Sequence, residues 1–348
     1  MLNTLETSRQ RVEAFHKRQP LTSWFTQELG GTLGQLLRPI KRVGLYIPGG
    51  VAPLPSSVIM SAIPAKVAGV SEIVVVTPPN PSYEHLVHPI ILATCAMLGI
   101  EEIYTLVGAQ AIAALAYGTK QIPAVDKIFG SGNLFVTLAK KQVYGVVGID
   151  GLFGPTETMV IADETANPQW VAADLLAQAE HDVLASAILL TPSPKFANLV
   201  QQEVLHQIET LPRKNVILES LPTRSGAIVV AGLQEAVDLA NAYAPEHLCL
   251  AVKDAWRLTE KINNAGGVFL GEYSSEVLGD YIADPSHVMP TSGSARFAST
   301  LNVWDFIHII NLIALDEESG KKISSLAATF TRAENLEAHA RAADCRMT

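Results

Sequence analysis

The sequence VGLYI at residues 43–47 begins the pattern that decides the fold of this chain. This largely apolar run predicts a strand that is buried on both faces, and a helical pattern at 57–68 and another apolar run at 73–77 follow it. Strands that alternate with helices in this order are typical of βαβ units, in which neighbouring strands run parallel. The opening of the pattern therefore predicts an α/β domain around a parallel sheet.

The same alternation continues along the chain as two series of elements. The first series has predicted strands at 43–47, 73–77, 102–107, 127–129 and 143–149. The second series follows Gly154, with predicted strands at 159–162, 187–191, 216–219, 227–230, 248–252 and 268–271. Two such series predict an α/β protein with two doubly wound, Rossmann-like domains built on parallel sheets.

The positions of the two series also suggest where the domains begin and end. We expect an NAD-binding-side domain at 43–157, inserted into a zinc- and substrate-binding domain made of 1–42 and 158–303. Lys321 to Arg346 is rich in alanine and charged residues and has no strand pattern, which predicts helices. Residues 304–348 are therefore expected to form a helical C-terminal tail.

Charge and composition exclude several classes of protein. The net charge is −9 over 348 residues, whereas nucleic-acid binding requires a basic face. The three cysteines are scattered and make neither a disulfide framework nor a CxxC metal site. No signal peptide or membrane span is visible. We expect a soluble cytoplasmic protein without a nucleic-acid or membrane partner.

Residues 243–248, Tyr-Ala-Pro-Glu-His-Leu, hold the strongest candidate for acid–base chemistry. Glu246 and His247 lie between a helical pattern and a predicted buried strand, where a rigid scaffold presents side chains. An imidazole titrates near neutral pH, and a partly buried carboxylate can be tuned towards it. The alternative is structural, because a proline followed by a glutamate also suits the start of a helix.

A glycine-rich turn, Gly130-Ser131-Gly132-Asn133, follows the predicted strand at 127–129. Such turns let backbone amides approach a phosphate at the start of a helix. No GxGxxG motif with a downstream acidic residue is present, so the fingerprint of a Rossmann dinucleotide site does not support this interpretation. The alternative, which the local sequence favours, is that the glycines serve tight turns between strand and helix.

Three further segments hold candidate polar ligands. Gln178 and His181 are three residues apart near the end of a predicted helix, so they share a face and together offer an oxygen and a nitrogen to a metal. The polar loop at 279–288 offers Asp280, Asp284 and His287. The alternatives are a histidine favoured by the helix dipole and an ordinary surface turn.

The tail contributes the last candidates, Glu334 and His339. Five residues on a straight helix correspond to about 140° of rotation, so these side chains would flank a ligand from two sides. The alternative is a solvated helix face.

Taken together, these segments resemble the histidinol dehydrogenase family over nearly the whole chain. The matching segments are 43–56, 108–118, 125–133, 178–181, 243–248, 279–287 and 334–340. Several such segments in the right order are far more specific than any one of them.

The resemblance implies a zinc-dependent, NAD-linked enzyme that oxidises L-histidinol twice, through an aldehyde, to L-histidine. It implies that Glu246 and His247 are the acid–base pair. The implied zinc ligands are Gln178, His181, Asp280 and His339. The implied NAD site contains Tyr46, Gln110 and Asn133. The implied substrate contacts are Thr156, Gln178, His181, His287 and Glu334. The family is a homodimer whose C-terminal tail completes the neighbour's site, which implies shared active sites here.

Two departures from the family pattern leave alternatives open. Thr156 stands where the family usually has serine, which adds a methyl group beside the substrate. The family also normally carries several tens of residues ahead of Arg9, so we expect a shortened member or a paralogue. The alternatives are a paralogous zinc- and NAD-dependent dehydrogenase that acts on another polar alcohol, and a non-catalytic zinc-binding homologue.

Overall fold

A computed structural model of the chain describes residues 1–49, 53–283 and 285–347, and the candidate Asp284 lies outside these residues. The chain forms two compact units. The first unit contains Met1–Gln19 and Ile40–Phe306, and the second contains Pro20–Pro39 and Ile307–Thr348. Among the described residues, no helix has both the length and the apolar character needed to cross a membrane.

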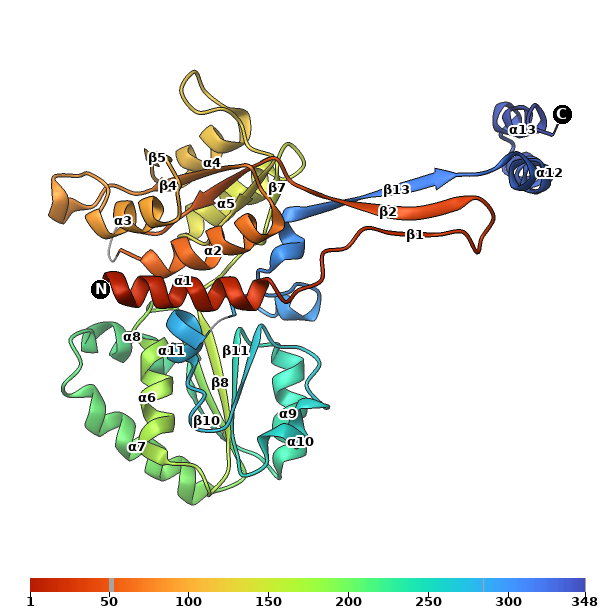
Figure 1. The fold of residues 1–348 in the computed structure, drawn as a ribbon. Helices are drawn as coiled ribbons and strands as arrows, with labels where there is room; N and C mark the ends of the chain where they lie inside the picture. The colour runs from red at the N-terminus through yellow and green to blue at the C-terminus, as the bar shows by residue number, and fades with distance from the viewer. Residues whose placement is uncertain (50–52, 284, 348) are drawn as a thin grey trace. The chain divides into compact units, whose positions relative to one another are not determined.

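The first unit contains two five-stranded parallel sheets, which confirms the predicted fold class (Figure 1). The first sheet has the order β5-β4-β3-β6-β7, with β5 at Glu102–Thr105, β4 at Glu72–Thr77, β3 at Arg42–Tyr46, β6 at Lys127–Phe129 and β7 at Gly148–Ile149. The last strand is shorter than the predicted 143–149, because Val143 still belongs to the preceding helix.

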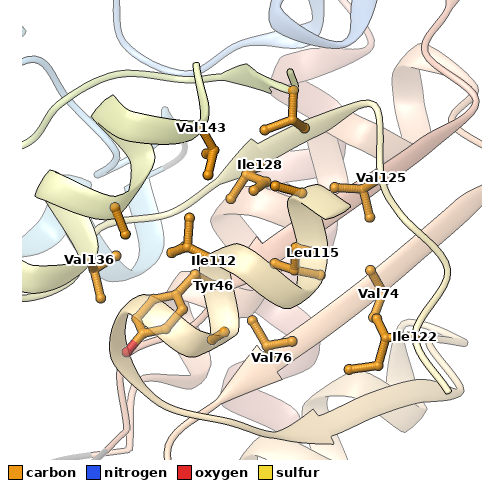
Figure 2. Packing of buried hydrophobic residues seen from close by; sticks show 14 residues of the cluster. Tyr46, Val74, Val76, Ile112, Leu115, Ile122, Val125, Ile128, Val136 and Val143 are labelled. Carbon is orange, nitrogen blue, oxygen red and sulfur yellow. The ribbon is translucent and has the colours of Figure 1, made fainter. Parts of the chain in front are cut away.

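Helices cover both faces of this first sheet. On one face lie α4 (Gly108–Tyr117) and α5 (Leu134–Val143). The helix α2 (Pro55–Ala68) contacts β3 and takes no part in the apolar cluster that α4 and α5 form with the sheet. The apolar side chains between α4, α5 and the strands form one buried cluster, shown in Figure 2. Tyr46 lies at the edge of this cluster with its hydroxyl oxygen directed away from the other labelled side chains. Because Tyr46 is the last residue of β3, its side chain lies at the carboxyl end of that strand.

The second sheet has the same design. Its order is β10-β9-β8-β11-β12, with β10 at Gly226–Val229, β9 at Ser186–Thr191, β8 at Glu157–Ala162, β11 at His247–Ala251 and β12 at Gly267–Leu270. Successive residues of β8 face opposite sides, as the two-residue period of a strand requires. Met159 packs with α9 (Leu233–Tyr243), whereas Val160 packs with α6 (Pro168–Ala179) and α7 (Pro194–Ile208).

Both sheets have a point at which the strand order reverses. In the first sheet the chain moves outward from β3 through β4 to β5 and then returns to the other side of β3 as β6. The second sheet repeats this arrangement around β8 and β11. Ligands of open α/β sheets bind outside the carboxyl ends of the strands at such a point. The carboxyl ends of β3 and β6 are therefore the expected place for a nucleotide.

The second unit is built from an antiparallel sheet and two helices. Strands β1 (Trp24–Thr26) and β13 (Ile307–Ala314) pair on either side of β2 (Thr32–Pro39). The helices α12 (Glu317–Ala333) and α13 (Glu337–Asp344) follow, and Figure 1 shows them at the C-terminal end of the chain. The predicted helical tail is confirmed for these two helices, but the sequence pattern did not indicate the strand that precedes them.

One predicted strand is wrong. Residues 216–219 lie inside the helix α8 (Lys214–Arg224). Ile217 is fully buried and packs with Leu176 of α6 and Ile208 of α7. A short apolar run has no period long enough to distinguish a strand from one buried turn of helix, and here packing against two helices decides.

Candidate active site

The candidate acid–base pair follows a sharp corner between a helix and a strand. Helix α9 ends at Ala244, which has a left-handed backbone with φ of +56° and donates its N–H to the carbonyl of Ala240 at 2.8 Å. This conformation is unfavourable for a residue with a Cβ atom and persists only where the surrounding structure holds it. The corner leads directly into Glu246 and His247, whose side chains are both buried.

Glu246 contacts the segment that enters the central strand β8. Its Oε2 lies 2.6 Å from Oγ1 of Thr156 and accepts a hydrogen bond from the backbone N–H of Glu157 at 3.1 Å. Thr156 Oγ1 also lies 2.8 Å from Oε1 of Gln178. Burial raises the pKa of Glu246, and the nearby His247 opposes this effect. A raised pKa allows this carboxyl to exchange a proton closer to neutral pH.

His247 is held at both ring nitrogens. Nδ1 donates to the backbone carbonyl of Glu157 at 3.2 Å, and Nε2 lies 3.3 Å from Oδ1 of Asp280. Burial alone would lower the pKa of His247, but the hydrogen bond to Asp280 and the charges of Glu246 and Glu276 outweigh it and raise this pKa. The ring orientation is therefore fixed, and the surrounding carboxylates favour the protonated imidazolium.

Gln178 and His181 come from the C-terminal end of α6. Gln178 is the second-last residue of the helix and is buried, and the backbone N–H of His181 donates to its carbonyl at 3.0 Å. The His181 residue is exposed, but enough protein lies around its imidazole to remove it partly from water. This partial removal from water lowers its pKa, whereas the charge of Asp280 raises it. A neutral imidazole is the form that binds a metal ion.

Asp280 and His287 connect this site to the first sheet. Asp280 lies in a single wide turn, Gly279–Ala283, and its backbone carbonyl accepts a hydrogen bond from Nδ1 of His287 at 2.9 Å. Because Nδ1 donates, Nε2 of His287 is the acceptor for the hydroxyl of Ser57 at 3.1 Å. Ser57 belongs to α2, which follows the carboxyl end of β3. The two sheets thus meet at the candidate site.

The two sheets contribute opposite edges to this meeting point. Thr156 directly precedes β8, and Glu246 directly precedes β11, so the acid–base residues lie at the amino edge of the second sheet. Ser57 marks the carboxyl edge of the first sheet. A second hydrogen bond, from the backbone N–H of Gly154 to Oγ1 of Thr291 at 2.6 Å, joins the segment before β8 to the loop that contains Thr291.

The three residues expected in the NAD site gather at the reversal point of the first sheet. Tyr46 ends β3, Asn133 caps α5 by accepting from the N–H of Val136 at 3.2 Å, and Gln110 lies in the first turn of α4. The N–H of Gly108 donates to the Tyr46 hydroxyl at 3.4 Å. Burial raises the pKa of that hydroxyl. The structure therefore brings these residues to one edge.

Glu334 and His339 belong to the second unit. Glu334 ends α12, and His339 lies in the first turn of α13. Within the described residues, no group of three or more histidine, cysteine, aspartate or glutamate side chains is placed to hold a metal ion. The first unit supplies one histidine and one aspartate of the expected ligand set, together with the amide of Gln178, which is not among these residue types.

Two buried carboxyl groups near the site were not anticipated. Glu157 accepts the N–H of Ser292 at 3.1 Å, and burial raises its pKa to about 7. Glu276 is fully buried and accepts from Oγ1 of Thr158 at 2.7 Å, and burial raises its pKa to about 7 as well. One oxygen of each carboxyl has no hydrogen-bond partner within the described parts of the chain. Glu157 and Glu276 are thus two further buried acidic side chains close to Glu246 and His247.

The buried carboxyl of Glu276 predicts a stability that depends on pH. Its folded pKa of about 7 lies above the usual 4.5, so its charge penalises folding increasingly as the pH rises through this range. Glu276→Gln is expected to stabilise the protein by about 3 kcal/mol at pH 8 and by only about 0.4 kcal/mol at pH 4.5. Urea unfolding at both pH values, with a chelator present throughout, measures the difference. An equal gain at both pH values would contradict the prediction.

Comparisons with known proteins agree on one family. A sequence profile described as histidinol dehydrogenase matches residues 1–347. The chain is 52% identical over 347 residues to the histidinol dehydrogenase of Moorella thermoacetica, covering 99% of this chain and 81% of that protein. It is 51% identical over 344 residues to that of Thermus thermophilus, covering 99% and 82% respectively.

Solved structures give the same result at the level of the fold. The crystal structure of histidinol dehydrogenase from Elizabethkingia anophelis superposes with a TM-score of 0.95 at 39% identity, over 99% of this chain and 80% of that one. An NAD-dependent aldehyde dehydrogenase from Sinorhizobium meliloti superposes with a TM-score of 0.53 at 14% identity, over 87% and 72% respectively. The second likeness concerns the fold alone.

Proposed function

The chain belongs to the histidinol dehydrogenase family, and we propose that it oxidises L-histidinol to L-histidine through the aldehyde, with NAD as hydride acceptor and zinc as cofactor. The observation that carries this proposal is the buried pair of Glu246 and His247 at the edge where the two sheets meet through Ser57 and His287. An acid–base pair beside a nucleotide-binding edge is what hydride removal from an alcohol requires.

The chemistry of the donor set fits a zinc ion. Gln178, His181 and Asp280 offer an amide oxygen, an imidazole nitrogen and a carboxylate oxygen, and His339 of a neighbouring chain would complete the set. The lowered pKa of His181 supports this role, because a ligand imidazole must be unprotonated. When bound, zinc supplies Lewis acidity and orients the substrate.

The residues of the site divide the proton transfers between them. His247 would accept the proton of the substrate hydroxyl at Nε2 as the carbon loses hydride, because Nδ1 stays on the carbonyl of Glu157 and Asp280 would be engaged as a zinc ligand. Glu246 would take a proton from the water that adds to the aldehyde, which converts the aldehyde into a hydrate for the second oxidation. Overall, one alcohol and one water yield one carboxylate, two hydrides and three protons.

The carboxyl edge of the first sheet fits a dinucleotide. The turn at 130–133 leads into α5, whose N-terminus is favourable for phosphate. A Cβ atom on Gly132 would lie 2.9 Å from Val136 and 3.0 Å from the ring of Tyr46, so only glycine fits this close approach. NAD supplies the acceptor for hydride, and the protein positions it.

The direct test is a steady-state assay of NADH formation from L-histidinol and NAD, with and without a chelator. We expect activity that the chelator abolishes and added zinc restores. Thr156 makes a substrate panel worthwhile, because its methyl group adds bulk beside Gln178 and Glu246. Turnover of another polar alcohol in preference to L-histidinol would support a paralogue, and the absence of NADH with every alcohol would refute an oxidoreductase.

We further propose that the protein is a homodimer with shared active sites. The second unit exposes many large apolar side chains, and such exposure marks a surface that is covered by another molecule. These side chains include Trp24, Phe25, Leu29, Ile309, Ile310, Ile313, Leu326 and Phe330. A second copy of this unit would bury them by two-fold symmetry.

The zinc assignment predicts a loss of metal when one ligand is removed. His181→Ala is expected to lower zinc content to a small fraction of the wild-type value, because the site loses its imidazole from the first unit. Elemental analysis after dialysis measures the metal per chain. His206→Ala is the matched control, because His206 is an exposed histidine on α7 outside the ligand set. Full zinc occupancy in His181→Ala would refute the assignment.

A further inference from the structure

A buried ion pair holds the glycine-rich turn of the first sheet. Lys140 of α5 pairs with Asp150, which follows β7, and the two side chains are only 2% and 3% exposed. Nζ of Lys140 donates to the carbonyl of Gly130 at 2.9 Å, and Oδ2 of Asp150 accepts from the N–H of the same residue at 2.7 Å. One pair of charges therefore satisfies both backbone polar groups of Gly130.

The space around Gly130 excludes any residue with a side chain. Its φ of +108° is a conformation that favours glycine, and a Cβ atom there would lie 2.0 Å from the carbonyl oxygen of Tyr46. The ion pair also connects to its surroundings, since Asp150 accepts from the N–H of Gly151 at 2.8 Å and Lys140 lies over the ring of Phe153. The turn is thus fixed from α5 and from the end of β7 at once.

Burying a charged pair is an expensive way to gain stability. The cost of removing both charges from water can exceed their attraction, and apolar residues of similar volume often stabilise a protein as well or better. A buried pair that also hydrogen-bonds one particular backbone residue instead fixes the position of that residue. Here the held peptide lies between Tyr46 and Asn133, two residues of the proposed NAD site.

We propose that Lys140 and Asp150 are positioning residues for the dinucleotide. They fix Gly130, and with it the turn at 130–133, which packs against Tyr46 and ends at Asn133. This inference rests on the proposed NAD site. It assigns no contact with the cofactor to either charged side chain, because both are turned to the backbone of the turn. Small displacements of groups that hold a reactant weaken its binding or turnover strongly.

The test compares Lys140→Met, Asp150→Asn and the double variant Lys140→Met/Asp150→Leu with wild type in the zinc-loaded enzyme. We expect each to raise KM for NAD and the Kd for NAD about tenfold or more, while KM for L-histidinol and zinc content stay within about twofold. The matched control is Arg42→Met. Arg42 is a buried cation paired with Glu102 and Glu72 at the opposite, amino edge of the same sheet. It should lower the melting temperature without changing KM for NAD.

The possible results separate this inference from the function on which it rests. A wild-type enzyme that binds no NAD would refute the proposed function. Normal binding of NAD by wild type and by folded variants of the pair would overturn the positioning role alone. An equal rise of both KM values, or the failure of all three variants to fold while Arg42→Met folds, would show a general structural role and overturn it as well.

Discussion

Glu246→Gln is expected to slow oxidation of the aldehyde by about 10²- to 10⁴-fold while it slows oxidation of the alcohol far less. Only the aldehyde step needs an activated water, and a glutamine amide cannot accept its proton. The substitution keeps the shape of the side chain, so the contacts to Thr156 and to the N–H of Glu157 remain possible. The loss should therefore report the proton transfer rather than a damaged fold.

The comparison variant for this prediction is His247→Asn, which should slow both steps by a similar factor because each hydride transfer releases a proton to the imidazole. Assays started from L-histidinol and from the aldehyde, each with NAD, separate the two half-reactions. Equal losses in both assays for Glu246→Gln would contradict the division of roles between the two residues.

Mixed dimers are expected to regain about a quarter of wild-type active sites when two inactive variants are combined. If Glu334 and His339 complete the neighbour's site, His247→Asn and His339→Ala homodimers are each nearly inactive. In a mixed dimer, one site collects both defects and the other collects none. Random pairing makes half of the dimers mixed, and half of their sites are then intact.

The experiment unfolds the two variants together, refolds them and measures NADH formation, with mass spectrometry to confirm mixed dimers. The matched control combines His247→Asn with Glu246→Gln, two substitutions on the same side of the site, which should restore nothing. Mixed dimers of His247→Asn and His339→Ala that regain no activity would show that each site is built within one chain.

The sequence predicted the parallel sheets well because their strands carry the signal within themselves. Runs such as 73–77 are apolar on both faces, and they can only be buried between layers of helices. The strand β13 had no such signal. Ile309 and Ile310 are half exposed, and the partner strand β2 lies far away in the chain, so neither periodicity nor local propensity identifies the pair.

The candidate site shows the same contrast. The pair Glu246 and His247 stands out because a carboxylate and an imidazole are adjacent at a predicted boundary between elements. Glu276 gives no comparable signal, because a glutamate after two serines is equally typical of the start of an exposed helix. Its burial depends on where the chain returns after β12, and tertiary packing alone determines that. Lys140 likewise reads as a surface residue of α5 until Asp150 is placed beside it.

The meeting of two opposite sheet edges has a mechanical consequence. Across the described residues of the first unit the two sheets share no strand, so under the proposed function the substrate and NAD would be held by different sheets, which are bridged by contacts such as Ser57 with His287. The distance that hydride crosses would then depend on the angle between the two sheets. Because a misplacement of about 1 Å can cost roughly 100-fold in rate, turnover becomes a sensitive gauge of that angle. Substitutions of the side chains that bridge the sheets would then change the turnover rate more than the melting temperature. Substitutions in the apolar cores would change the melting temperature more than the turnover rate.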